Sequence, residues 1–349
     1  MPIPRLRSAA VALALVAAVM VPAPPASAAG ASYVALGDSY SSGTGTRSYL
    51  ADGTSCQRSV YAYPSLIASA RGYALNFRAC SGATVPDVVA TQLGALSPTT
   101  SYVSLSVGGN DASFVPVLTE CAKPAWMSNC NAAIDRAQAF IVNQLPAGLA
   151  SLYAQIRARA PQASVTIAGY PRLFNGEDCN AGTWFSPTEE ARLNATADLL
   201  NRTTATAATA AGFTFGNPTV PFVGHAVCDD VEWLNGLSSP TSESYHPNRT
   251  GHASGYVPLL SASLTGSRVS VTQATVQSAE LSAPALAQQQ QGYAAEDARI
   301  TPKKFVAPDL KSPAARAAAA RAGVDLADPA SIDRADRAAE VRQNCARQG

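Results

Sequence analysis

The sequence has little with which to bind nucleic acid or a metal ion. Its net charge is +1, and the core region carries no block of basic residues, which argues against a nucleic-acid partner. The seven cysteines form no CxxC pair and no cysteine–histidine cluster with zinc spacing. We therefore expect neither a metal ion nor a cofactor.

Beyond the N-terminal leader, the sequence also lacks a membrane span and an internal repeat. No later segment approaches the roughly 18 uninterrupted apolar residues that a membrane helix needs. The leader itself has Arg5 and Arg7, an apolar run from Ala9 to Val21, and small residues up to Ala28. This pattern is typical of an export signal. We expect residues 1–28 to be removed and the mature protein to be a secreted, extracellular monomer without an integral membrane segment.

An oxidising compartment makes the cysteines candidates for disulfides. Six cysteines allow 15 pairings, and we choose one by order and local spacing. This choice pairs Cys56 with Cys80, Cys121 with Cys130 and Cys179 with Cys228. It leaves Cys345 single.

Strand and helix patterns alternate along the chain. Short apolar runs bounded by small residues predict strands, beginning near Tyr33, Ala74, Tyr102, Ser164 and Phe213. Helical patterns lie between them, including a long one from Asn131 to Ala160 that Pro146 should kink or split. Another should begin at Ser186, whose Glu189 completes a capping-box sequence. This order predicts an α/β fold with a parallel sheet covered on both faces.

The chain changes character at about Thr265. Glutamine and alanine runs and mixed charges with few aromatic residues follow, and such a composition cannot build a second core. We expect the globular domain at residues 29–264. The tail at 265–349 should be largely disordered or partly helical.

Ser39 follows the first strand in the stretch YVALGDSYSSGTG. The carboxyl ends of parallel strands form the crevice where ligands bind, so a hydroxyl there can act as a nucleophile if a base takes its proton. The sequence has only three histidines. His225 lies in an apolar, cysteine-bearing stretch and is predicted to be a packed structural residue. His252 is predicted to have a capping or surface role. His246 lies in a loop just before the last helix, where its imidazole could be held over the crevice.

Four blocks resemble those of the SGNH (GDSL-type) hydrolases, and the chain is similar to secreted actinobacterial esterases and lipases of that family. They are GDS at 37–39, Gly82 after the second strand, GGND at 108–111, and His246-Pro247. The resemblance covers roughly residues 31–264. It implies a three-layer αβα sandwich with a flavodoxin-like, five-stranded parallel sheet. No GxSxG occurs, which excludes the nucleophile elbow of α/β-hydrolases.

The resemblance also implies the roles of individual residues. Ser39 would be the nucleophile and His246 the general base. The backbone N–H groups of Ser39 and Gly82 and the side-chain amide of Asn110 would form the oxyanion hole. The family pattern has Asp three residues before the histidine, whereas this chain has Glu243. Either Glu243 or a main-chain carbonyl near Ser244 could orient the imidazole. We favour the carbonyl because Glu243 lies in an exposed-looking, serine-rich loop, where a flexible carboxylate is more often solvated than engaged.

These observations predict a secreted serine esterase or lipase that hydrolyses lipid or short-chain acyl esters through an acyl-enzyme. Phospholipase and carbohydrate acetyl esterase activities are the alternatives on the same scaffold. An extracellular binding protein without turnover is the alternative from another class. It is disfavoured because Ser39, Gly82, Asn110 and His246 are all present.

Overall fold

The computed structural model describes residue 1 and residues 30–348. The expected export signal therefore lies outside the described residues, apart from Met1. Five parallel strands form one sheet in the order β2-β1-β3-β4-β5, which is the flavodoxin-like order and confirms the predicted fold class. The strands are β1 (Ser32–Gly37), β2 (Ala74–Phe77), β3 (Tyr102–Ser106), β4 (Ser164–Ala168) and β5 (Thr214–Gly216). In the register, Tyr33 of β1 lies opposite Leu75 of β2 and Tyr102 of β3.

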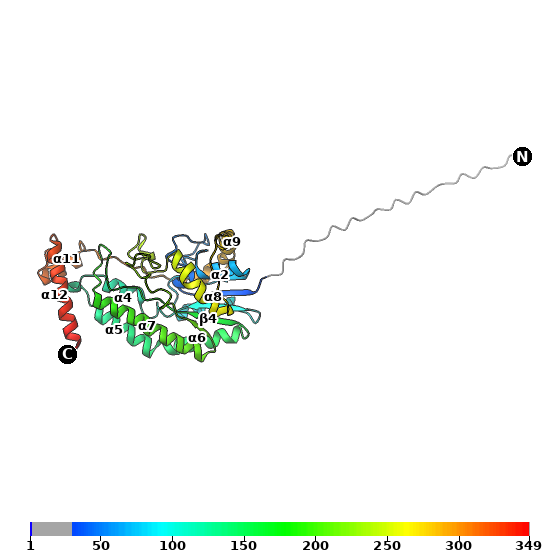
Figure 1. Cartoon of the computed structure of the whole chain (residues 1–349), viewed down its shortest axis with the longest axis horizontal. Helices are drawn as coiled ribbons and strands as arrows, with labels where there is room; N and C mark the ends of the chain where they lie inside the picture. Colours follow the sequence, from blue (N-terminus) through cyan, green and yellow to red (C-terminus); the bar gives the residue numbers. More distant parts are fainter. Residues whose placement is uncertain (2–29, 349) are drawn as a thin grey trace.

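Helices cover both faces of this sheet (Figure 1). One layer consists of α2 (Tyr63–Arg71), α8 (Val257–Thr265) and α9 (Gln273–Gln291), and the other includes α5 (Cys130–Asn143), α6 (Leu145–Arg159) and α7 (Pro187–Ala210). Short elements lie at or near the carboxyl ends of the strands: α1 (Ser39–Ser42), α3 (Val85–Asp87), α4 (Phe114–Cys121) and η3 (Ala125–Met127).

Local signals in the sequence explain several helix boundaries. The long helical pattern is split where Pro146 occupies the first turn of α6, as predicted. Ser186 caps α7, and its hydroxyl and the Glu189 carboxylate form the expected capping box. These boundaries depend on neighbouring residues only, which is why the sequence could predict them.

Of the two alternatives expected for the tail, largely disordered or partly helical, the described residues have the helical one. The tail forms four helices: α9, α10 (Ala294–Asp297), α11 (Pro313–Ala322) and α12 (Pro329–Gln348). It builds no large core of its own, because α9 packs against α2 and β2 while α11 and α12 pack against η3. Alanine-rich helices with little apolar surface can be stable when another domain covers that surface. The tail thus belongs to the same folded unit as the sheet.

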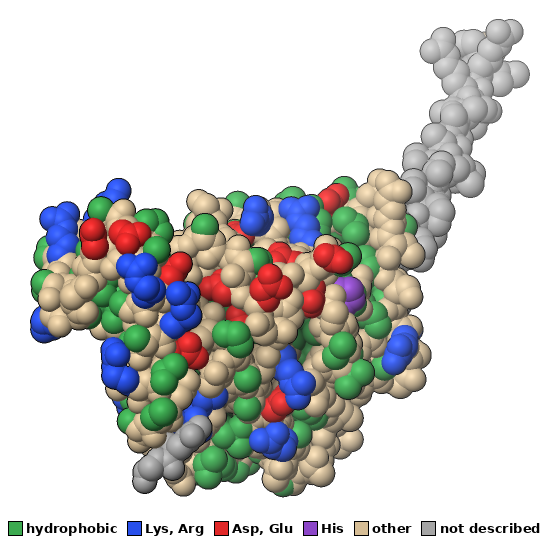
Figure 2. Space-filling view, turned by 60° about the vertical axis from the view of Figure 1, so that its left-hand side comes forward, with side chains coloured by type: hydrophobic (Ala, Val, Ile, Leu, Met, Phe, Trp, Pro, Cys, Tyr) green, Lys and Arg blue, Asp and Glu red, His purple; other side chains and the backbone are tan. Residues whose placement is uncertain are grey.

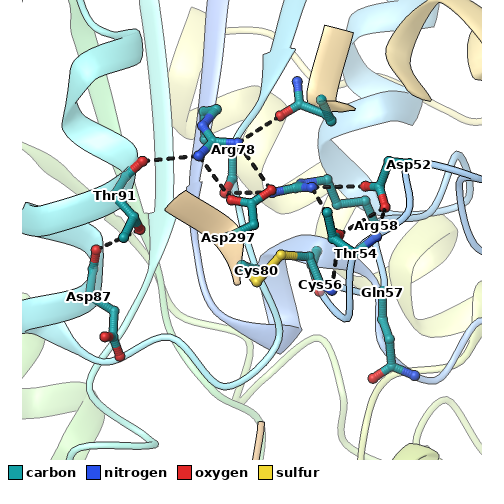
Figure 3. Close-up of a disulfide and its surroundings, with 12 residues drawn as sticks. Asp52, Thr54, Cys56, Gln57, Arg58, Arg78, Cys80, Asp87, Thr91 and Asp297 are labelled. Carbon is teal, nitrogen blue, oxygen red and sulfur yellow. Dashed lines mark hydrogen bonds and ion pairs between the residues drawn. A yellow bond between two sulfur atoms is a disulfide. The ribbon is translucent and has the colours of Figure 1, made fainter. Parts of the chain in front are cut away.

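A buried ion-pair cluster joins the tail to the loops beside β2 (Figure 3). The Asp297 carboxylate binds Arg58 at 2.7 Å and Arg78 at 2.9 Å, and all three side chains are fully buried. Arg58 also binds Asp52 at 2.8 Å. Burial lowers the pKa of Arg78, while the Asp297 charge opposes that shift. Because Asp297 lies 239 residues from Arg58 in the chain, this cluster is a long-range contact that local patterns do not reveal.

The structure forms all three expected disulfides. They join Cys56 to Cys80, Cys121 to Cys130 and Cys179 to Cys228. Cys345 is exposed on α12 and belongs to none of them. The first disulfide lies directly below the buried ion-pair cluster in Figure 3.

Charged side chains of both signs are interspersed on the face shown in Figure 2. Across the described residues, no helix combines the length and the apolar character of a membrane span.

Candidate active site

Strand β1 and a glycine turn present Ser39 at the carboxyl edge of the sheet. Gly37 has φ +118°, and a Cβ there would lie 2.4 Å from the carbonyl oxygen of Ser106. Only glycine fits this turn. Asp38 then caps the short helix α1, with its side chain accepting a hydrogen bond from the Tyr40 N–H. Ser39 is the first residue of that helix, so its position is fixed by the backbone on both sides.

The structure brings Ser39 and His246 together as the sequence predicts. The distance from Ser39 Oγ to His246 Nε2 is 2.9 Å, although the two residues are 207 positions apart. Their exposed fractions are 6 % and 5 %. Burial lowers the pKa of His246 to about 4, so the imidazole is neutral at neutral pH. A neutral ring can accept the serine proton at Nε2.

The other ring nitrogen of His246 faces the main chain. Nδ1 lies 2.8 Å from the carbonyl oxygen of Ser244, which fixes the tautomer with the proton on Nδ1. Tyr245, between them, has φ +61°, a left-handed conformation that is uncommon for a non-glycine residue. The Tyr40 hydroxyl donates to the Tyr245 carbonyl at 2.9 Å. This bent backbone turns the Ser244 carbonyl toward the imidazole.

Glu243 has another partner. Its carboxylate accepts a hydrogen bond from the Tyr49 hydroxyl at 2.6 Å and lies 3.5 Å from the exposed Arg47. The expectation of a solvated carboxylate in an exposed loop was wrong, because Glu243 is only 2 % exposed. Tyr49, which packs against Glu243, lies 194 positions from it in the sequence. The sequence alone does not reveal this contact.

We expect Glu243→Gln to lower kcat by less than about tenfold. Loss of an orienting carboxylate in a serine triad has cost about 10⁴-fold, but here the Ser244 carbonyl holds Nδ1. Glutamine can still accept from Tyr49. The measurement is kcat on a p-nitrophenyl ester, with Tyr49→Phe as the control that removes the same hydrogen bond from the other side. A folded Glu243→Gln protein that has lost three orders of magnitude would assign the orienting role to the carboxylate.

Gly82 and Asn110 line the same cavity as Ser39 and His246. The cavity has a volume of about 190 Å³. Gly82 follows the Cys56–Cys80 disulfide and has φ +88°, and the Asn110 side-chain amide donates to the Ala83 carbonyl at 3.0 Å. The four residues that the sequence singled out therefore surround one space.

Asp38 is a site residue whose role was not anticipated. Its buried carboxylate accepts from Ser106 Oγ at 2.6 Å and also from the Tyr170 hydroxyl. Burial raises its pKa to about 6. Asp38 belongs to the GDS motif, which is the only signal in the sequence that could have indicated it. Its hydrogen bonds tie the turn carrying Ser39 to β3.

An apolar cavity lies beside the Ser39–His246 pair. It has a volume of about 60 Å³ and is lined almost entirely by apolar side chains, among them Phe114, Leu118 and Leu200. The rings of Tyr40 and Phe114 belong to its wall and lie 5.4 and 6.2 Å from the His246 ring, measured between centroids. An acyl chain is the part of an ester that such a surface favours.

The other two histidines are not among the residues that line this cavity. His225 stacks on Trp233 with centroids 3.7 Å apart, in keeping with the structural role predicted for it. His252 is fully buried, and its Nδ1 accepts a hydrogen bond from the Tyr63 N–H at 3.3 Å. The expected capping or surface role of His252 was therefore wrong, because tyrosines from α2 and η5 (Gly251–Tyr256) enclose its ring.

A serine–histidine pair over the carboxyl ends of a parallel sheet is an arrangement that can hydrolyse acyl compounds through a covalent intermediate. Residues 35–254 match the GDSL-like lipase/acylhydrolase family. The chain belongs to this family, as the sequence predicted.

Individual relatives give the same result. The chain is 44 % identical to a lipase from Streptomyces rimosus, over 66 % of this chain and 85 % of the relative. It is 42 % identical to lipase 1 from Streptomyces coelicolor, over 68 % and 88 %.

Among solved structures, it is similar to an extracellular lipase from S. rimosus (42 % identity, TM-score 0.63). It is also similar to a phospholipase A1 from Streptomyces albidoflavus (41 %, TM-score 0.63). In both cases 67 % of this chain covers 100 % of the other.

Proposed function

We propose that the protein hydrolyses lipid or short-chain acyl esters through an acyl-enzyme, with Ser39 as the nucleophile and His246 as the general base. The observation that carries the proposal is the 2.9 Å contact between Ser39 Oγ and His246 Nε2 in a mostly buried cavity. The Ser39 oxygen attacks the ester carbonyl as its proton passes to Nε2. The imidazolium then returns that proton to the departing alcohol.

Deacylation repeats these steps with water as the nucleophile. Water loses a proton to His246, attacks the acyl carbonyl, and the acid leaves as the proton returns to Ser39. The N–H groups of Ser39 and Gly82 and the Asn110 amide are the proposed donors to both oxyanions. The proton on Nδ1 is held by the Ser244 carbonyl, which also stabilises the imidazolium.

The surroundings support an acyl ester as the substrate. The apolar cavity next to His246 suits a hydrocarbon chain, and two relatives are named lipases. Phospholipase activity is the second candidate, since a similar structure is that of a phospholipase A1.

We further propose that residues 29–264 are the catalytic domain, against which the tail packs as part of one folded unit, and that the protein is exported after removal of residues 1–28. Three disulfides support an oxidising, extracellular location. The mature enzyme is proposed to be a monomer.

A fluorophosphonate probe should label the wild-type protein at Ser39, because only an activated serine reacts. Mass spectrometry of the labelled peptide locates the adduct. His246→Ala should abolish labelling, while His225→Ala, which alters a histidine outside the cavity, should leave it intact. Hydrolysis of p-nitrophenyl esters of increasing acyl length then measures the chain preference. An unlabelled wild-type protein that hydrolyses no ester would overturn the proposal.

A further inference from the structure

The tail reaches the catalytic cavity. Pro302, Lys303 and Lys304 belong to the lining that also includes Ser39 and His246. A Cβ built on Gly82 would lie 2.5 Å from Pro302 Cα, so this proline packs directly against one of the proposed oxyanion residues. The S. rimosus lipase and the S. albidoflavus phospholipase are covered in full by 67 % of this chain, and the family match ends at residue 254.

The segment that passes over the cavity, residues 298–305, is held at both ends. Before it, Asp297 binds the buried Arg58 and Arg78 beside the Cys56–Cys80 disulfide (Figure 3). At its end, Phe305 is buried and packs edge-on against Tyr245, with ring centroids 5.0 Å apart. We call residues 298–305 the crossing segment. Its two anchors make it a fixed wall of the cavity.

The crossing segment brings unbalanced positive charge to this wall. None of the residues lining the cavity is acidic, and His246 is neutral at neutral pH because burial lowers its pKa to about 4. Lys303 and Lys304 are exposed, and neither forms an ion pair within 4.0 Å in the described part of the chain. Their ammonium groups are available to an anionic ligand.

We propose that the crossing segment completes the substrate site and that Lys303 and Lys304 bind the phosphate of a glycerophospholipid. This inference rests on the proposed ester hydrolysis and names the substrate class of the same site. Lysine is a common phosphate ligand, acting as a point charge. In a glycerophospholipid only a glycerol unit separates the phosphate from the acyl carbonyls. A lysine pair beside Ser39 can therefore hold the phosphate while an acyl ester lies at the nucleophile.

The test compares dihexanoyl phosphatidylglycerol with dihexanoylglycerol, both as monomers, because the two share their acyl chains and only the first carries a phosphate, within its phosphoglycerol headgroup. Lys303→Gln/Lys304→Gln should lower kcat/KM for the phospholipid about tenfold, mainly through KM, since each exposed ion pair contributes a factor of a few. The neutral ester should change less than about twofold. The same variant should lower kcat/KM for dihexanoyl phosphatidylcholine by as much as for the anionic phospholipid, because the lysines are proposed to bind the phosphate itself and not the net charge of the lipid.

A matched control removes two charges elsewhere in the tail. Lys311→Gln/Arg316→Gln alters exposed residues that do not line the cavity and should affect neither substrate. High salt should reduce the difference between wild type and Lys303→Gln/Lys304→Gln, because it screens exposed charges.

Several outcomes would overturn the inference. Equal losses on the phospholipid and on dihexanoylglycerol would make the lysines structural, and unchanged kinetics on both would mean that they bind no phosphate. A gain on both substrates would make the crossing segment an obstruction. Failure of the proposed function is distinct, since the wild type would then hydrolyse neither ester.

Discussion

We expect Ser39→Ala and His246→Ala each to lower kcat by about 10³-fold or more on a soluble p-nitrophenyl ester, and the double variant to lose little beyond either single variant. In the proposed mechanism the two groups share one proton transfer, across the 2.9 Å contact between Ser39 Oγ and His246 Nε2. Without the base, the serine hydroxyl attacks slowly. Without the serine, the base has no nucleophile to activate. Residual activity would come from the oxyanion donors and from substrate binding.

Ser42→Ala is the matched control for this experiment. Ser42 lies in the same short helix and is fully buried. Its hydroxyl donates a hydrogen bond to the Ser39 carbonyl oxygen at 3.3 Å and forms none with His246. It should retain most of the activity. Thermal unfolding of all variants separates lost chemistry from lost structure. Losses that multiply in the double variant would contradict a shared step.

The second large effect concerns stability. We expect Asp297→Asn to lower the free energy of unfolding by about 3–5 kcal/mol, the range found when one partner of a buried ion pair is removed. Arg58 keeps Asp52 as an acidic partner at 2.8 Å. Arg78 keeps only neutral acceptors, the Gln290 amide and the Thr91 carbonyl, each at 3.0 Å. Its guanidinium charge would therefore be buried without a counter-charge.

Urea unfolding followed by fluorescence gives this free energy, and Glu296→Gln provides the control. Glu296 precedes Asp297 on the same helix, and the substitution changes the net charge equally without touching the cluster. It should alter stability by less than about 0.5 kcal/mol. A loss below about 1 kcal/mol in Asp297→Asn would show that Arg78 is stabilised by its neutral acceptors.

Much of the fold was predictable because its signals are local. Each strand is a short apolar run, Pro146 separates α5 from α6, and the Ser186–Glu189 pair begins α7. The candidate site was predictable for a related reason. The motifs at Ser39, Gly82 and Asn110 follow the first three strands, and parallel strands bring their carboxyl ends to one edge.

Other features depend on contacts between distant parts of the chain. Glu243 is in a serine-rich loop, and only Tyr49, folded over it, makes it buried. The burial of His252 also depends on a distant part of the chain, because Tyr63 of α2 packs against its ring. The tail is the clearest case. The composition of the tail predicts that it builds no large core of its own. It does not reveal that the tail helices pack against the rest of the protein.

The Asp297 cluster also constrains the order in which the protein can mature. Arg58 and Arg78 are made early and Asp297 more than 200 residues later, with separations of 239 and 219 positions. Until residue 297 is available, Arg58 can pair with Asp52, but the Arg78 guanidinium has no acidic partner and should stay hydrated or partly exposed. Truncation at the apparent domain boundary near Thr265 would leave the remaining chain permanently in that incomplete state. The folded unit of this protein is therefore longer than the part that matches its family, residues 35–254.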